Sequence, residues 1–241
     1  MPGVFTVFQR EIGGYFSSLY AYLIAFALLV IMGILFITDL DSAAGQRPPD
    51  PSAIPTFLSF AMIFFAPLLT MRLLAEEKRE GTLELLLTSP ASDTGIVVGK
   101  FLGAWTYYTL ILAISFVYQL ILMGIAQPDL ARAIAAYIGI WLYGGACMSV
   151  GMVFSALTEN QIVAAFLASA MLFLFWIGDR VGQVITNIEV AQVLRELTLQ
   201  GHFSTSFAYG LLHAEDVVYF AGIIVVMLFI TVRLVESNRW R

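Results

Sequence analysis

The sequence predicts an all-α polytopic membrane protein. Hydrophobic residues make up 60% of its 241 residues and charged residues only 12%, about half the charged fraction of a soluble domain. The mean hydropathy of +0.87 agrees with a chain whose main solvent is lipid. A helix needs about 20 apolar residues to cross a bilayer, and backbone groups in lipid must pair within helices or a closed barrel. Long uncharged runs therefore predict six transmembrane helices, at approximately 19–37, 54–74, 98–124, 133–157, 161–178 and 217–235.

The polar segments between these spans are too short to form a soluble core of their own. We therefore expect one transmembrane domain over residues 1–241. The run at 19–37 is longer than the apolar core of a signal peptide, which favours a retained first span.

The first residues, MPGVFTVFQREIGGYFSSLY, predict an amphipathic helix before the first span. Phe5, Phe8, Ile12 and Phe16 lie near one helical face, and such a helix lies in the plane of the lipid headgroups. The alternative is a frayed tail, against which the aromatic residues argue.

Residues 75–100 hold the densest group of charges, between spans two and three. REGTLELLLTSP predicts a short helix against the membrane, with Leu83, Leu86 and Leu87 on one face and Glu80 and Glu84 on another. We expect this helix to end before Pro90, because proline lacks the backbone donor that a helix needs. Its length and charge indicate a docking site for another protein, and a solvated loop is the alternative.

The third span is expected to begin at Ser92 or Asp93, because both are good N-cap residues. GIVVGKF, at residues 95–101, differs from a phosphate-binding loop in its glycine spacing and in the Phe101 that follows the lysine. We therefore expect this chain to bind no ATP and place Lys100 at the membrane interface.

Span four is rich in small residues, and small residues four apart allow helices to approach closely. They serve either as packing within one subunit or as a seam that moves during transport. These residues are Gly144, Gly145, Ser149, Gly151 and Ser155.

The segment between spans five and six predicts a helix followed by a re-entrant stretch. Val190, Val193, Leu194 and Leu197 follow helical spacing, and Gly201 is expected to break the pattern. We expect this segment to close the outer end of a transport path.

The distribution of positive charge favours both termini in the cytoplasm, since cytoplasmic segments are enriched in Lys and Arg. With that orientation, the inside segments hold Arg10, Arg72, Lys78, Arg79, Lys100, Arg233, Arg239 and Arg241. The outside segments hold Arg47, Arg132, Arg180 and Arg195.

The chemistry of the chain argues against several classes of function. It has one cysteine, Cys147, and its two histidines, His202 and His213, are too far apart to form a helical metal pair. We expect no metal site, no bound cofactor and, without a basic tract, no nucleic acid. Intramembrane enzymes and ion-driven carriers need ionisable groups at membrane depth, and the uncharged runs contain none.

EEKREGTLELLLTSPASDTGIVVGKFLGA, at residues 76–104, closely resembles the cytoplasmic segment of type-2 ATP-binding-cassette (ABC) permeases, especially the gliding-motility-type and copper-maturation-type subunits. GHFSTSFAYGLLHAEDVVYF, at residues 201–220, is similar to the external region before their last span. The resemblance implies a permease subunit of an exporter in the bacterial inner membrane. It also implies a coupling helix that contacts a separate ATPase through Glu76, Glu77, Lys78, Arg79, Glu80, Gly81, Thr82 and Glu84, with Leu83 and Leu86 packed beneath.

The resemblance further implies an assembly with two ABC ATPase subunits, which bind ATP and Mg²⁺, and a second permease that is a copy or a paralogue. An accessory subunit is possible, and neither motif identifies the cargo. One alternative is a membrane anchor that recruits an ATPase without transporting anything, and an intramembrane enzyme is the other.

Overall fold

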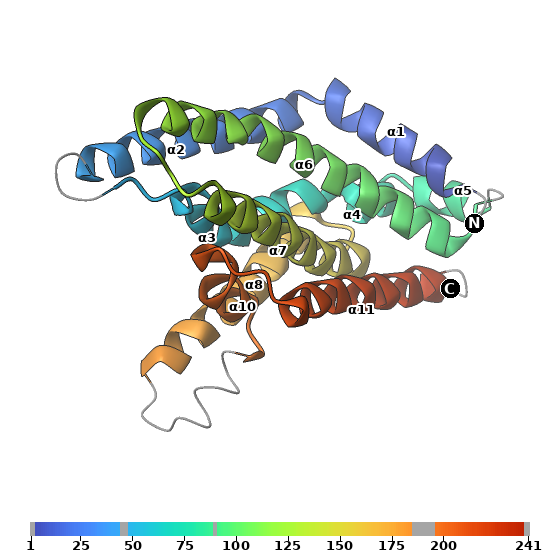
Figure 1. Ribbon diagram of the computed structural model, residues 1–241. Helices are drawn as coiled ribbons and strands as arrows, with labels where there is room; N and C mark the ends of the chain where they lie inside the picture. The colour runs from blue at the N-terminus through green and yellow to red at the C-terminus, as the bar shows by residue number, and fades with distance from the viewer. Residues whose placement is uncertain (1–2, 44–47, 89–90, 185–195, 239–241) are drawn as a thin grey trace.

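The computed structural model describes residues 3–43, 48–88, 91–184 and 196–238, and all regular secondary structure in these ranges is helical (Figure 1). Six stretches of helix are long and apolar enough to cross a membrane. They are α2 (Leu19–Ala43), α3 (Ala53–Thr70) together with α4 (Arg72–Arg79), α6 (Asp93–Ile125), α7 (Leu130–Leu157), α8 (Gln161–Val184) and α11 (Ala214–Asn238). The predicted all-α membrane fold with six spans is confirmed.

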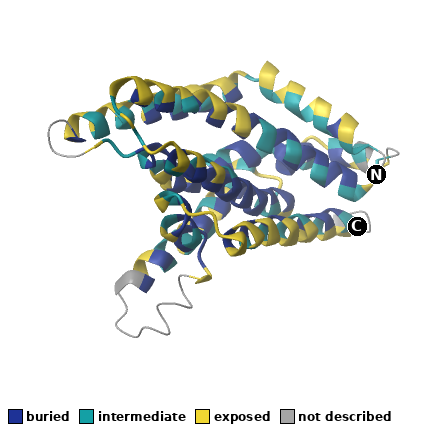
Figure 2. Ribbon diagram, viewed as in Figure 1, coloured by how far each residue is buried: buried dark blue, intermediate teal, exposed yellow. Residues whose placement is uncertain are grey.

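α7 lies at the centre of the bundle, where α3, α6, α8 and α11 pack against it (Figure 1). Figure 2 shows α7 buried along most of its length, whereas α2 and α11 are largely exposed. Glycines permit this packing, because a Cβ added at Gly144 would overlap Tyr108 of α6, and one at Gly151 would overlap Thr70 of α3.

The predicted N-terminal helix is present as α1 (Val4–Ser17), which lies along α6. Ser18 adopts an extended conformation and separates α1 from α2. Val7 is buried, Phe5 and Phe16 are exposed, and Phe8 and Ile12 are half-buried. Location of α1 in the headgroup plane stays a prediction.

The segment before the last span contains α10 (Leu199–Thr205) and a short 3-10 helix, η1 (Phe207–Tyr209). The prediction that Gly201 interrupts a helix is wrong. The Thr198 side chain caps α10 by accepting a hydrogen bond from the Gly201 N–H, so Gly201 lies in the first turn. Val190, Val193 and Leu194 lie outside the described residues, and re-entry into the membrane stays a prediction.

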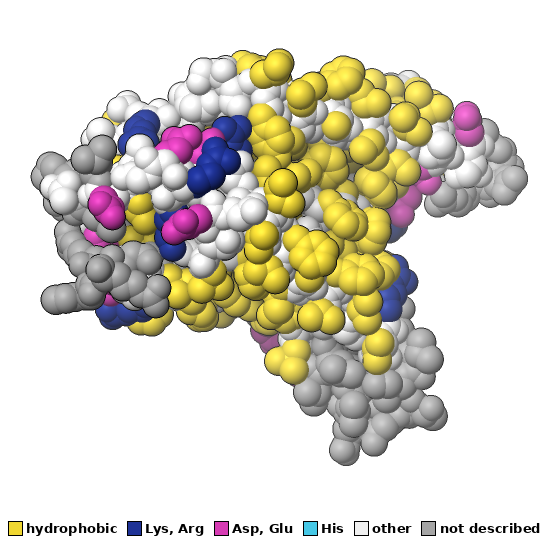
Figure 3. Space-filling model, turned by 180° about the vertical axis from the view of Figure 1, so that it is seen from behind, with side chains coloured by type: hydrophobic (Ala, Val, Ile, Leu, Met, Phe, Trp, Pro, Cys, Tyr) yellow, Lys and Arg dark blue, Asp and Glu magenta, His cyan; other side chains and the backbone are white. Residues whose placement is uncertain are grey.

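The surface of the bundle divides into apolar and charged regions. In Figure 3 a broad band of hydrophobic side chains covers the middle of the molecule, and acidic and basic side chains gather toward its ends. Figure 1 places α5 (Thr82–Leu87), the N-terminal helix α1 and the C-terminal end of α11 at the same end. This arrangement is typical of a protein that spans a membrane and exposes its charged ends to water.

Candidate functional site

A glycine turn divides the segment that was predicted to contact an ATPase. α4 ends at Arg79, Gly81 has a φ of 70°, and α5 begins at Thr82. Glycine suits this left-handed conformation because it has no Cβ. The prediction of one helix over residues 79–90 with Glu80 and Glu84 on one face is wrong, because the turn separates these residues. α5 ends at Leu87 with Thr88 as its C-cap, so the helix ends before Pro90 as predicted, and Pro90 itself lies outside the described residues.

The ten predicted contact residues differ sharply in exposure. Arg79, Glu80, Gly81 and Glu84 are exposed, and together we call them the exposed turn. Two of the remaining residues, Glu77 and Leu83, are buried, and four are intermediate: Glu76, Lys78, Thr82 and Leu86. A partner protein can reach the exposed turn directly, whereas Glu77 faces the interior of the chain.

Glu77 belongs to a cluster of four charges that joins three helices. Its Oε1 lies 3.0 Å from Nζ of Lys100 on α6 and 3.0 Å from an Nη of Arg10 on α1. The Lys100 Nζ also lies 2.9 Å from Oε2 of Glu11. We call these four residues the ion cluster. Its two positive and two negative charges compensate one another, as buried charges require.

The side chain of Lys100 is only 4% exposed, and its location at the membrane interface stays a prediction. Sequence reasoning missed the ion pairs that bury it, and with them the roles of Arg10 and Glu11. A usable signal was present, because Gly95, Gly99 and Gly103 follow the same four-residue spacing that marks close packing in span four.

The glycines of α6 allow α1 to approach closely. A Cβ added at Gly99 would lie 2.8 Å from the carbonyl oxygen of Val4, and one at Gly103 would lie 2.8 Å from Cβ of Glu11. This close approach brings Glu11 within reach of Lys100.

Ser155 fastens the beginning of α4 to the end of α7. Its Oγ accepts hydrogen bonds from the backbone N–H groups of Leu74 and Ala75, both at 3.1 Å, and donates one to the carbonyl of Met71 at 3.0 Å. The first N–H groups of a helix have no partner within the helix, so an outside acceptor stabilises them. The Lys78 ammonium donates to the carbonyl of Ala156. Both ends of α4 are therefore held by α7.

The five small residues predicted for helix packing are all buried in α7. Gly144 and Gly145 face Tyr108 and Trp105 of α6, and Gly151 faces Thr70 of α3. A seam that moves during transport stays a prediction.

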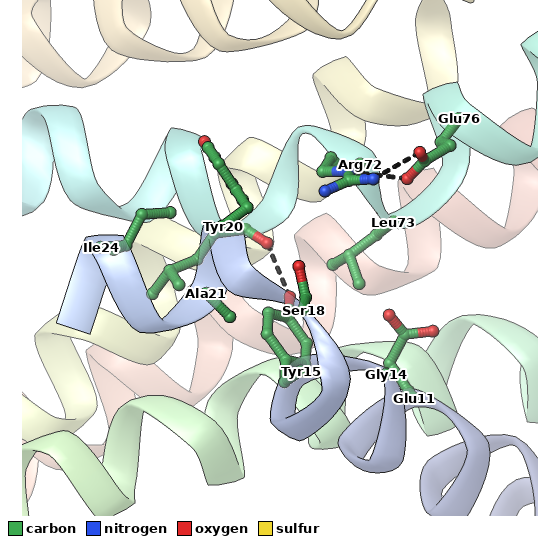
Figure 4. A pocket seen from close by; sticks show the side chains of 11 residues that line it. Glu11, Gly14, Tyr15, Ser18, Tyr20, Ala21, Ile24, Arg72, Leu73 and Glu76 are labelled. Atoms are coloured by element: carbon green, nitrogen blue, oxygen red, sulfur yellow. Dashed lines mark hydrogen bonds and ion pairs between the residues drawn. The ribbon is translucent and has the colours of Figure 1, made fainter.

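A cavity of about 220 Å³ lies between the α1–α2 bend and the α3–α4 junction (Figure 4). Arg72 donates from Nε and Nη2 to both oxygens of Glu76, at 2.7 and 2.6 Å. The Tyr15 hydroxyl donates to the carbonyl of Leu69 at 2.6 Å. Burial, followed by the negative charge of Glu11, raises the pKa of the Tyr15 hydroxyl well above its ordinary value, so it remains a donor. The lining residues are Glu11, Gly14, Tyr15, Ser18, Tyr20, Ala21, Ile24, Leu69, Arg72, Leu73 and Glu76.

At the other end of the bundle, His202 joins α10 to α11. Its Nδ1 lies 2.6 Å from a carboxylate oxygen of Asp216, and its Nε2 lies 2.9 Å from the carbonyl oxygen of Glu196. His213 is exposed. Within the described residues, no three His, Cys, Asp or Glu side chains are grouped so that they could hold a metal ion.

Comparisons with known proteins bear on the segment that contains the exposed turn. A sequence model described as "ABC-2 family transporter protein" matches residues 50–178. The chain is 31% identical over 167 residues to a Pseudomonas aeruginosa protein named "Probable ABC transporter permease protein NosY". That match spans 65% of this chain and 58% of the relative. The family match begins at residue 50, so it includes Glu77 and Lys100 of the ion cluster but not Arg10 and Glu11 of α1.

Proposed function

Because the chain belongs to the ABC-2 family of transporter proteins, we propose that it is the transmembrane permease subunit of an ABC exporter and couples to separate ATPase subunits. Family membership supports a bacterial inner-membrane location and ATPase partners. The proposed assembly contains two ATPase chains, which bind ATP and Mg²⁺, and a second permease copy or paralogue. In the proposed orientation, both termini and the exposed turn are cytoplasmic.

The observation that carries this proposal is that the exposed turn directly follows α4, a helix that α7, α6 and α1 hold in place. Arg79, Glu80 and Glu84 offer both charge signs to a partner surface. Charges at the rim of an interface orient the partners and speed their encounter. The half-buried Leu86 lies near the turn and adds apolar contact.

The anchoring determines how a displacement of the turn reaches the membrane. α4 is nearly continuous with α3, contacts the end of α7 through Ser155, and contacts α1 and α6 through the ion cluster. A push on the turn during ATP-driven closure of the ATPases would therefore move several spans together. Conformational changes of this kind involve packed helices that shift as units.

Charge reversal at the turn tests the coupling. We expect the double variant Glu80→Arg/Glu84→Arg to insert and fold like the wild type but to lose regulation of its co-purified ATPase in proteoliposomes. Both side chains are exposed, so their reversal leaves the packing unchanged. Glu215→Arg, which reverses an exposed acid at the opposite end of the bundle, is the matched control.

The result can contradict the proposal in two ways. Unchanged ATPase regulation in the double variant would remove the coupling role of the turn. Normal regulation in the wild type, without movement of any solute or lipid tested across the proteoliposome membrane, would instead favour the anchor that recruits an ATPase.

A further inference from the structure

Two charged side chains of opposite sign that line the cavity between α1, α2 and α4, Glu11 and Arg72, keep hydrogen-bonding capacity. Lys100 contacts Oε2 of Glu11, and Oε1 of Glu11 has no hydrogen-bond partner among the described residues. Arg72 uses Nε and Nη2 for Glu76, and its Nη1 has no partner in the same described part of the chain. Both groups line the cavity, so a ligand there meets an anion and a cation together.

The position of the cavity suits a molecule that is polar at one end and apolar at the other. Glu11 on α1 and Arg72 on α4 supply its charged groups (Figure 4), and Ile24, Leu69 and Leu73 add apolar lining. Drug-sized ligands typically occupy pockets of about 300–1,000 Å³, so a space of about 220 Å³ suits a headgroup better than a whole lipid. The adjoining surface of α2 exposes Leu19, Leu23 and Phe26, along which acyl chains can lie.

We propose that this cavity binds the headgroup of an amine-bearing phospholipid, with the ammonium at Glu11 and the phosphate at Arg72. A primary ammonium has N–H donors for a carboxylate, and a guanidinium is well suited to phosphate oxygens. Phosphatidylcholine has no N–H donor, and phosphatidylglycerol has no cation for Glu11. Phosphatidylethanolamine satisfies both positions. The proposal requires a chain embedded in a membrane and does not rest on its coupling to an ATPase.

The bound lipid would hold the α1–α2 bend against α4. Glu11 belongs to the ion cluster, and Arg72 begins the helix that leads to the exposed turn. The headgroup therefore bridges α1 and α4, which are two of the three helices that the ion cluster joins. We expect it to stabilise their contact.

Filling the cavity tests the proposal without removing a charge. Gly14 lines the cavity and Gly13 does not, yet a Cβ at either position meets no atom within 4 Å. Native mass spectrometry of the delipidated full chain, with equal concentrations of phosphatidylethanolamine, phosphatidylcholine and phosphatidylglycerol, would measure the first lipid bound. We expect a preference for phosphatidylethanolamine that Gly14→Phe reduces about tenfold or more and Gly13→Phe preserves.

A second pair of variants tests the charges. Arg72→Gln/Glu76→Gln removes one ion pair from the cavity, and Arg233→Gln/Glu236→Gln removes a comparable surface pair elsewhere. We expect only the first variant to lose the preference for phosphatidylethanolamine. Equal binding of all three lipids, or the same loss in Gly13→Phe and Gly14→Phe, would overturn the proposal. Tight binding of soluble glycerophosphoethanolamine alone would assign the site to a free ligand instead of a lipid.

Discussion

Replacement of Lys100 by methionine should destabilise the protein strongly, although it removes only one charge. The side chain is 4% exposed, and its ammonium lies 2.9 Å from Glu11 and 3.0 Å from Glu77. Methionine keeps an unbranched side chain of similar length, so the main loss is electrostatic. Glu77, whose side chain is 9% exposed, would retain only the contact with Arg10.

The geometry sets the expected magnitude. Removal of one partner from a buried ion pair costs about 3–5 kcal/mol, because the remaining charge stays buried without compensation. Arg10 provides the matched contrast, since its side chain is 63% exposed. Loss of an exposed partner costs about 0–1 kcal/mol. We therefore expect Lys100→Met to lower the free energy of unfolding several times more than Arg10→Gln does.

Equilibrium unfolding in mixed micelles, followed by circular dichroism while the denaturing detergent is increased, measures both variants. The double variant Lys100→Met/Glu77→Gln should recover part of the loss, with a coupling energy of about 0.5–3 kcal/mol. A loss below about 1 kcal/mol in Lys100→Met, or strictly additive losses in the double variant, would refute a compensated buried cluster.

Four further perturbations follow from local geometry. Ser155→Ala should cost about 1–2 kcal/mol in the same unfolding assay, because three hydrogen bonds at the start of α4 depend on its hydroxyl; an unchanged value would show that water replaces them. Gly151→Ala should cost about 1–3 kcal/mol through overpacking, while Gly222→Ala, which has open space, should not; equal effects would contradict the close contact. Gly81→Ala should cost about 1–2 kcal/mol at its φ of 70°, and a stability gain would exclude the left-handed turn. The pKa of the Tyr15 hydroxyl is raised in the folded protein, so the unfolded chain loses this proton at a lower pH. Stability should therefore fall as the pH rises above about 10. If the melting temperature of Tyr15→Phe falls as steeply with pH as that of the wild type, other groups cause the decrease.

Local features were the most predictable from sequence. Ser92 or Asp93 was predicted to cap the third span, and the Ser92 hydroxyl accepts a hydrogen bond from the Gly95 N–H, whereas Asp93 is the first residue of the helix. Six apolar runs predicted six helices because length and hydropathy suffice to define a membrane span. The helix over the first residues followed from the spacing of its aromatic side chains.

The ion cluster depends on contacts that a linear sequence does not display. Lys100 lies near the start of a span, where lysine commonly extends its charge to the interface. Its burial follows only when α1 packs on Gly99 and Gly103 and brings Glu11 to it. Gly81 posed a different difficulty, because a glycine within an apparently helical pattern does not by itself reveal a left-handed turn. The exposed and buried halves of the predicted coupling segment therefore could not be separated beforehand.

The glycine turn also separates two segments on which we expect different constraints on substitution. Up to Lys78, substitutions must respect bonds to α7, α6 and α1, whereas Arg79, Glu80 and Glu84 face outward. Under the proposed function, substitutions in the exposed turn can change which ATPase the chain recognises while the packing of the spans stays the same. We therefore expect that replacing the exposed turn with the corresponding residues of a related permease would redirect the chain to that permease's ATPase. The choice of ATPase would then depend on a short segment that can be exchanged without changing the spans.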